Sequence, residues 1–302
     1  MSRTIIACFC ALALACGADP APAPAPAGPP DAAPIEPAWV SRRVDEARAR
    51  LDSSEGGRLV AQAIEAHGGL STWLAHGTIE FDFDYQPLDR PERRMNTRNR
   101  VDLWRSRATQ RELGEGADAE LGWDGERAWI RPGPDAFPSP ARFWATTPFY
   151  FVGIPFVLSD AGVRLEMLDD AELDGVVHHV VKASFEPGTG DSPGDYYVLY
   201  VHPDTNRVSA LRYVVAYPGF FPSGGHSPEK LMRVEGLHEV SGVLLPARLD
   251  THAWDGETQT IGDRVTAIEI TNVRFGERWP ASTFAPPREG ATVIDTIEPA
   301  AR

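Results

Sequence analysis

The sequence predicts a mainly β protein of the α+β class, with about ten strands in an antiparallel meander behind one helical region. Apolar and polar residues alternate in short runs from residue 78 onward, as in strands with one dry face. Turn signals such as Asp124-Gly125 and the segment 203–206 join successive runs, which is typical of hairpins. Apolar residues between 44 and 64 recur instead at helical spacing, which places the helices before the sheet.

The first 15 residues predict a signal peptide. Residues 5–15 form an apolar run behind Arg3 that is too short to span a bilayer and has the length of a secretion signal. The run ends at Ala13-Leu14-Ala15-Cys16, which resembles the lipobox of bacterial lipoproteins. This resemblance implies that Cys16 is diacylated and begins the mature chain. The alternative is ordinary cleavage after Ala15, which would leave a free thiol.

Residues 16–38 predict a lipid-anchored cysteine followed by a disordered linker. Segment 19–30 is a Pro/Ala repeat, and such repeats adopt extended polyproline II and bury no apolar surface. Gly17, not Asp, follows Cys16, which favours the outer membrane under the sorting rule of enterobacterial lipoproteins. We therefore expect a chain held at the outer membrane by acyl chains, facing the periplasm, with one folded domain over residues 39–298.

The charge of the chain excludes some classes of partner. The formal net charge of −14 disfavours binding to nucleic acid and electrostatic attachment to anionic lipid. The three cysteines, Cys8, Cys10 and Cys16, all lie near the N-terminus, so the domain has none for a disulfide, a thiol nucleophile or a zinc site. The sequence leaves the oligomeric state open.

Residues 39–67 predict one or two helices. Val44, Ala47 and Leu51 lie on one helical face, and a second apolar stripe runs from residue 59 to residue 64. Gly56-Gly57 is expected to interrupt the helical region between these stripes. The segment 67–69, His-Gly-Gly, carries the signals of a helix C-terminus.

The clearest strand is 79–85, in which Phe81 and Phe83 alternate with three carboxylates, Glu80, Asp82 and Asp84. This alternation predicts one buried face and one solvated face. Paired-carboxylate hydrolysis is the less favoured interpretation of the same acidic residues. The other predicted strands are 121–123, 128–130, 163–168, 176–185, 196–202, 208–217, 231–240, 243–254 and 264–275.

Two irregular, proline-rich segments, 132–160 and 217–225, interrupt the strands and carry most of the clustered aromatic residues. Core packing explains many of these side chains. Paired aromatic residues in irregular segments also suit a rim or lid over an apolar cavity. We therefore predict that six residues lie near the mouth of such a cavity and contact a lipid or another apolar ligand. They are Trp144, Phe149, Phe151, Phe156, Phe220 and Phe221.

Several motifs together resemble bacterial lipoproteins related to the outer-membrane lipoprotein carrier proteins (LolA/LolB-like). The motifs are 63–69 with Trp73, Trp123-Asp124-Gly125, Ile154-Pro155-Phe156, the strand 195–200 and the closing strand 268–275. The resemblance covers most of residues 58–290. It implies a strongly curved antiparallel sheet, or incomplete β-barrel, with one or two helices on its concave side. In the carriers this concavity holds acyl chains, and they have no defined catalytic residues.

Motifs for catalysis are weak. Residues 190–194 match the G-x-S-x-G pattern around Ser192, but a strand-like run follows where a nucleophile elbow needs a helix. His178 and His179 are adjacent, so in a strand they point to opposite faces and do not share a metal. No nucleotide-binding or H-E-x-x-H motif is present, so we expect neither cofactor nor metal.

The sequence therefore favours a non-enzymatic, lipid-binding lipoprotein. Two alternatives stay open. A structural or protein-interaction lipoprotein of the cell envelope would have a filled concavity and an exposed apolar patch. A periplasmic hydrolase would bring polar groups together inside a pocket.

Overall fold

The computed structural model of the chain describes residues 33–297. The predicted signal peptide, Cys16 and residues 16–32 of the predicted linker lie outside these residues. Helix α1 (Pro37–Leu51) begins within the segment predicted as linker, so helical structure starts two residues before the predicted boundary at residue 39. Among the described helices, none is both long and apolar enough to cross a membrane.

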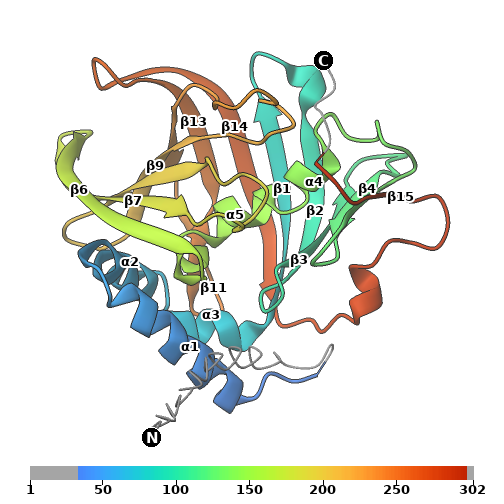
Figure 1. Cartoon of the computed structure of the whole chain (residues 1–302), viewed down its shortest axis with the longest axis horizontal. Helices are drawn as coiled ribbons and strands as arrows, with labels where there is room; N and C mark the ends of the chain where they lie inside the picture. Colours follow the sequence, from blue (N-terminus) through green and yellow to red (C-terminus); the bar gives the residue numbers. More distant parts are fainter. Residues whose placement is uncertain (1–32, 298–302) are drawn as a thin grey trace, which may run out of the picture.

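One strongly curved antiparallel sheet of 13 strands forms the body of the described chain (Figure 1). It is not closed into a barrel. This confirms the predicted mainly β class with a curved antiparallel sheet. In spatial order the strands are β15 (Thr292–Ile294), β5 (Ala128–Arg131), β4 (Glu120–Trp123), β3 (Arg107–Glu112), β2 (Met95–Asp102), β1 (Thr78–Pro87), β14 (Thr260–Phe275), β13 (Arg248–Asp255), β10 (Lys230–Val234), β9 (Val208–Val214), β8 (Tyr196–Val201), β7 (Val176–Phe185) and β6 (Val163–Leu173).

Helices cover the concave side and one end of the sheet (Figure 1). Helices α1, α2 (Glu55–Ala66) and α3 (Leu70–His76) lie together at one end, where α2 packs on β6 and β7. Short helices α4 (Ala141–Trp144) and α5 (Thr147–Gly153) lie across the concave face. The remaining elements are a hairpin of β11 (Leu237–Val240) and β12 (Val243–Pro246) and three 3-10 turns, η1 (Pro91–Arg93), η2 (Phe156–Ser159) and η3 (Ala281–Thr283).

The break between α1 and α2 lies before Gly56-Gly57, and not at this glycine pair as the sequence predicted. Ser54 precedes α2 in an extended conformation, and its hydroxyl accepts a hydrogen bond from the Gly57 amide at 3.0 Å, which caps the helix. Gly56 and Gly57 therefore lie in the first turn of α2. A Cβ atom on Gly57 would stand 2.0 Å from the Leu51 carbonyl oxygen, so the close turn between α1 and α2 requires glycine there.

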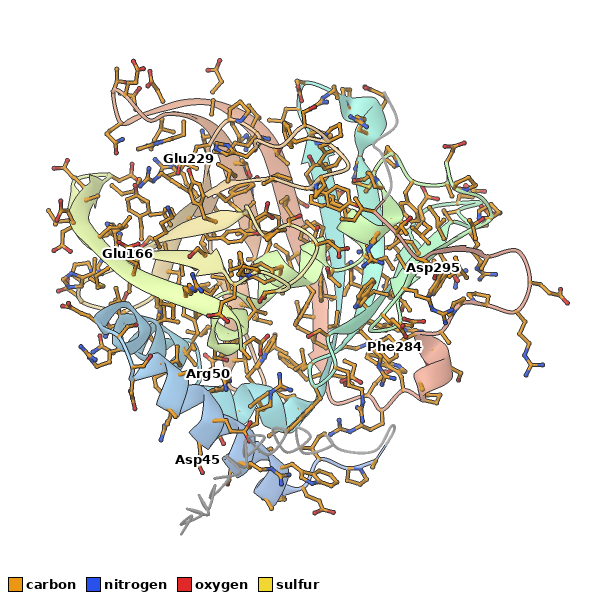
Figure 2. The ribbon with its side chains drawn as sticks, viewed as in Figure 1. Asp45, Arg50, Glu166, Glu229, Phe284 and Asp295 are labelled. Atoms are coloured by element: carbon orange, nitrogen blue, oxygen red, sulfur yellow. The ribbon has the colours of Figure 1, made fainter. Side chains whose placement is uncertain are left out.

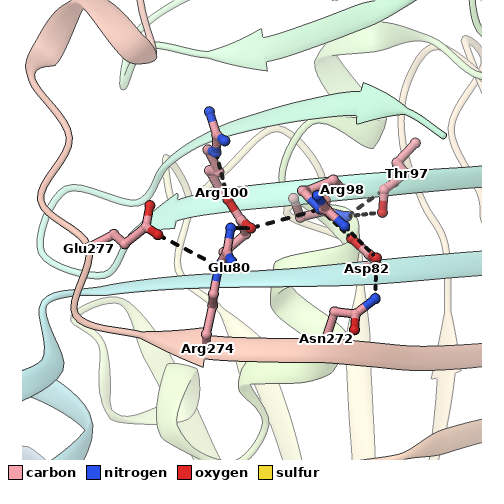
Figure 3. A network of polar contacts seen from close by, with 9 residues as sticks. Glu80, Asp82, Thr97, Arg98, Arg100, Asn272, Arg274 and Glu277 are labelled. Carbon is pink, nitrogen blue, oxygen red and sulfur yellow. Dashed lines mark hydrogen bonds and ion pairs between the residues drawn. The ribbon is translucent and has the colours of Figure 1, made fainter. Parts of the chain in front are cut away.

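The acidic face of β1 is not solvated, contrary to the sequence prediction. Glu80 and Asp82 are 2% and 7% exposed on the convex side of the sheet, beneath arginines from β2 and β14 (Figure 3). Arg100 donates to Glu80 at 2.7 Å, and Arg274 contacts the same carboxylate. Asp82 accepts hydrogen bonds from Arg98 and Asn272. The carboxylates are thus the buried members of an ion-pair ladder, a structural role for charges on a sheet.

Candidate functional site

A cavity of about 680 Å³ opens on the concave side of the sheet. Its floor includes inward-facing side chains of five strands: Phe83 and Tyr85 of β1, Tyr197 of β8, Tyr213 of β9, Met232 of β10 and Ile268 of β14. Helices α4 and α5 form a wall, and loops 88–94, 186–195 and 215–229 contribute to the rim. The volume falls in the range of small-molecule sites, about 300–1,000 Å³.

Five of the six residues predicted near a cavity mouth line this cavity. Trp144 comes from α4, Phe149 and Phe151 from α5, and Phe220 and Phe221 from the loop after β9. The sixth, Phe156, does not line it. Phe156 is 1% exposed, begins η2 and stacks on the Trp73 ring of α3 with centroids 4.6 Å apart. It therefore belongs to the core that joins α3 to η2.

The two irregular aromatic segments meet at the rim. The Phe143 ring of α4 lies 5.1 Å from the Tyr217 ring and 5.0 Å from the Phe220 ring, measured between centroids. Arg142, one residue earlier, forms a two-pronged ion pair with Asp191 of the loop before β8. These contacts link α4 to two rim loops, so the aromatic segments form one connected edge over the cavity.

Buried polar side chains hold α4 in place from below. Gln110 of β3 faces inward and donates hydrogen bonds to the Trp144 carbonyl at 2.7 Å and the Ala145 carbonyl at 3.1 Å. Gln110 is 1% exposed, and its Oε1 lies 3.5 Å from the Thr97 hydroxyl on β2. The end of α4, with Trp144 in the cavity wall, is therefore fixed to the sheet by hydrogen bonds as well as by packing.

Tyrosines of the sheet, which the sequence did not single out, supply much of the floor. Tyr197 and Tyr213 are stacked with centroids 6.1 Å apart, and Phe151 and Tyr150 of α5 pack on them. Burial raises the pKa of Tyr150 and Tyr197 well above the usual value. The Tyr150 hydroxyl and the Trp144 indole nitrogen have no hydrogen-bond partner within residues 33–297.

Asp195 places a carboxylate in the cavity wall. Its Oδ1 accepts a hydrogen bond from the Ala216 amide at 2.6 Å. Burial raises its pKa to about 6, although the Ala216 hydrogen bond acts in the opposite direction. Asp195 is therefore an acidic group of this cavity that changes charge near pH 6.

Cations gather at another part of the rim. Lys230 begins β10, and with Arg90 and Arg93 it lines the cavity. Burial raises the pKa of Tyr85, which lines the same cavity, and the charges of Arg90 and Arg93 act against this rise. Desolvation and the charge of Arg90 lower the pKa of Lys230. Position 230 faces the cavity only because of its register with β9 and β13, which sequence alone does not give.

The groups considered for catalysis lie apart. Ser192 lines the cavity from a turn in which its carbonyl accepts the Asp195 amide, and no histidine of the described chain lines that cavity. His178 bonds Ser209, and His179 contacts Asp170. Within residues 33–297 no cluster of three or more His, Cys, Asp or Glu side chains has the geometry of a metal site.

The convex surface offers little apolar area. Within the described residues the exposed large apolar side chains are Leu88, Val177, Val293 and Ile297, which come from four different segments. Scattered apolar side chains are ordinary on a soluble surface, whereas a docking face requires a contiguous patch. The concave cavity is therefore the apolar feature that calls for an occupant.

The curved sheet with helices across its concavity is the architecture that the sequence resemblance to LolA/LolB-like lipoproteins implied. Neither a family model nor a curated protein matches the sequence. Solved structures similar to this chain include a LolA superfamily protein from Nitrosomonas europaea (12% identity, 76% of this chain and 97% of that chain, TM-score 0.48). Others are a DUF1329 family protein from Desulfovibrio piger (11%, 82% and 97%, 0.39) and the lipoprotein LppX from Mycobacterium tuberculosis (10%, 76% and 100%, 0.26).

Proposed function

We propose that the protein binds a lipid or another apolar ligand in the cavity of its curved sheet. The observation that carries the proposal is an open cavity of about 680 Å³ lined mainly by aromatic and aliphatic side chains. A dry apolar cavity of about 150 Å³ holds benzene, or about 25 Å³ per carbon atom. On that scale the cavity has room for about 25 carbon atoms, enough for one long acyl chain.

The energetics suit an acyl chain. Each buried methylene contributes about 0.8 kcal/mol, so ten methylenes contribute about 8 kcal/mol, the free energy of a micromolar complex. Ordering of the chain and of the ligand reduces this figure. The end of helix α4 is already fixed to the sheet through Gln110, so little of that cost falls on this part of the cavity wall.

We further propose that the chain acts as a binding protein without catalysis, anchored by acyl chains on Cys16 at the outer membrane and facing the periplasm. The lipobox-like segment and the Pro/Ala repeat support the anchor. Ser192 lies in a turn, and no histidine of the described chain lines the cavity beside it, which supports a protein that binds its ligand without catalysis. The cavity favours this function over that of a protein-interaction lipoprotein with a filled concavity.

A neutral apolar dye, N-phenyl-1-naphthylamine, tests the proposal through its fluorescence on transfer from water into an apolar site. We expect saturable binding to the wild-type protein. Phe151→Asp and Phe221→Asp place a charge in the cavity wall and should weaken binding by at least about tenfold, since an unpaired carboxylate opposes apolar occupancy. Phe221 belongs to a rim loop, so its variant tests the site with less risk to the core.

Val177→Asp is the matched control. Val177 is 55% exposed on β7 and lies outside the cavity, so this variant adds the same charge without touching the site. It should bind the dye as the wild type does. Absence of saturable binding to the wild type, or equal binding by all four proteins, would contradict the proposal.

A further inference from the structure

Positive charge is concentrated at one place on the cavity rim of a strongly acidic protein. The chain has a net charge of −14, yet Lys230, Arg90 and Arg93 all line the cavity. Two of the three carboxylates that line the cavity are paired with arginines other than Arg90 and Arg93. Asp160 pairs with Arg43 and Asp191 pairs with Arg142, while the charge of Asp195 raises the pKa of Tyr150 and Tyr197.

Lys230 and Arg93 form no ion pair with a carboxylate of the described chain, although the charge of Asp89 acts on Lys230 from beyond ion-pairing distance. The neighbouring Glu229, labelled in Figure 2, precedes β10 and accepts hydrogen bonds from Tyr196 and Arg212. Desolvation and the charge of Arg90 lower the pKa of Lys230 by more than the charge of Asp89 raises it, and an anion bound beside the ammonium would offset this lowering.

The two arginines leave most of their charge available. Arg93 donates to the Pro138 carbonyl, a neutral acceptor. Arg90 pairs with Asp89 at 3.3 Å, but both side chains are more than half exposed, so water screens that pair. A group with one or two negative charges would therefore meet three cations and one exposed carboxylate at this part of the rim.

We propose that the cavity selects amphipathic anions: an apolar tail fills the space between α4–α5 and the sheet, and a carboxylate or phosphate headgroup binds Lys230 with Arg90 and Arg93. This inference rests on the proposed function and adds the chemical class of the ligand. Charge-assisted hydrogen bonds to a headgroup are stronger than neutral ones, which makes the charge a means of selection. A neutral lipid of equal tail length would fill the same space with lower affinity.

The test measures displacement of the neutral dye by palmitate, hexadecyl phosphate and hexadecanol, which share a 16-carbon tail. We expect one or both anions to displace the dye from the wild type at concentrations about tenfold lower than hexadecanol, as one charge-assisted bond implies. The stronger anion identifies the headgroup as carboxylate or phosphate. Lys230→Met should remove most of this preference and retain hexadecanol binding.

Lys182→Met is the matched control, because Lys182 and Lys230 are the two lysines of the chain. Lys182 lies on the convex face of β7 with its ammonium 4.6 Å from the Tyr196 ring centroid. This variant should keep the preference for anions. Equal displacement by hexadecanol and both anions, or an unchanged preference in Lys230→Met, would overturn the inference and leave dye binding intact. Absence of dye binding in the wild type would contradict the proposed function itself.

Amine labelling of the wild type keeps the inference testable where Lys230→Met does not fold. Saturating palmitate should protect Lys230 from an acylating reagent, as mapped by peptide mass spectrometry, and leave the labelling of Lys182 unchanged. Protection of neither lysine by palmitate, in a sample that binds the dye, would overturn it.

Discussion

Replacement of Asp195 by asparagine should stabilise the protein at neutral pH and not in acid. Burial raises the pKa of Asp195 from 3.8 to about 6, and no cation of the described chain pairs with it. Asparagine keeps an oxygen for the Ala216 amide and carries no charge. The variant therefore resembles the protonated form of the wild-type side chain at every pH.

The sign and size follow from linkage. Between pH 3.8 and about 6 the folded state retains a proton that the unfolded state has lost, so the free energy of unfolding falls as pH rises through this window. A shift of about 2 pKa units corresponds to about 3 kcal/mol, and partial contact with water reduces this to about 2 kcal/mol. The free energy of unfolding of Asp195→Asn should thus exceed that of the wild type by about 2 kcal/mol above pH 7. Below about pH 4 the two values should be equal.

Urea unfolding of both proteins at pH 4.0, 5.5 and 7.5 measures this difference. Asp255→Asn is the control, because the exposed Asp255 ends β13 beside a turn whose amide hydrogen bonds, from Thr258 and Glu257, lower its pKa. The control should be slightly less stable than the wild type at neutral pH, the opposite sign. A stability difference for Asp195→Asn that does not change with pH would contradict a raised pKa of Asp195 in the folded state.

Other substitutions act on the lipid anchor at Cys16 and on the scaffold around Glu80 and Gly57. Cys16→Ser should move the protein from the membrane to the soluble fraction after cell fractionation; unchanged membrane association would contradict lipid attachment. Glu80→Gln should lower the free energy of unfolding by about 2 kcal/mol, less than a fully buried pair, because Arg100 and Arg274 are about half exposed. The exposed Glu257→Gln should change it by less than about 0.5 kcal/mol, and equal effects would contradict a structural ladder. Gly57→Ala should cost at least about 1–3 kcal/mol in the same assay, since its Cβ would clash with the Leu51 carbonyl.

Strands with an apolar inner face could be predicted from sequence, and strands with a polar inner face could not. Phe81 and Phe83 alternate with carboxylates, so β1 was evident. In β2 the inward positions include Thr97 and Asn99, which are buried because the Asn99 amide donates to the Thr97 hydroxyl at 3.1 Å. Such a strand shows no apolar period, and neither β2 nor β3 was predicted.

The cavity, like the strands, could be predicted from its apolar residues and not from its polar ones. Aromatic residues in proline-rich segments indicated a rim, and five of the six line the cavity, because irregular segments beside a curved sheet meet at its edge. Phe156 lies elsewhere, since η2 turns it toward Trp73. Lys230 and Asp195 gave no local signal. Their positions depend on strand register and on a contact with Ala216 across the chain, which only three-dimensional structure supplies.

Native mass spectrometry of the full chain, isolated from the membrane fraction of its own cells, shows whether the cavity holds a lipid. We expect protein with an added mass equal to one apolar, anionic molecule that extracts into organic solvent. Phe151→Asp, prepared in the same way, should lack this mass, and Val177→Asp should retain it. A wild-type protein that carries no such molecule and takes up none from added palmitate would contradict the claim that this cavity binds lipid.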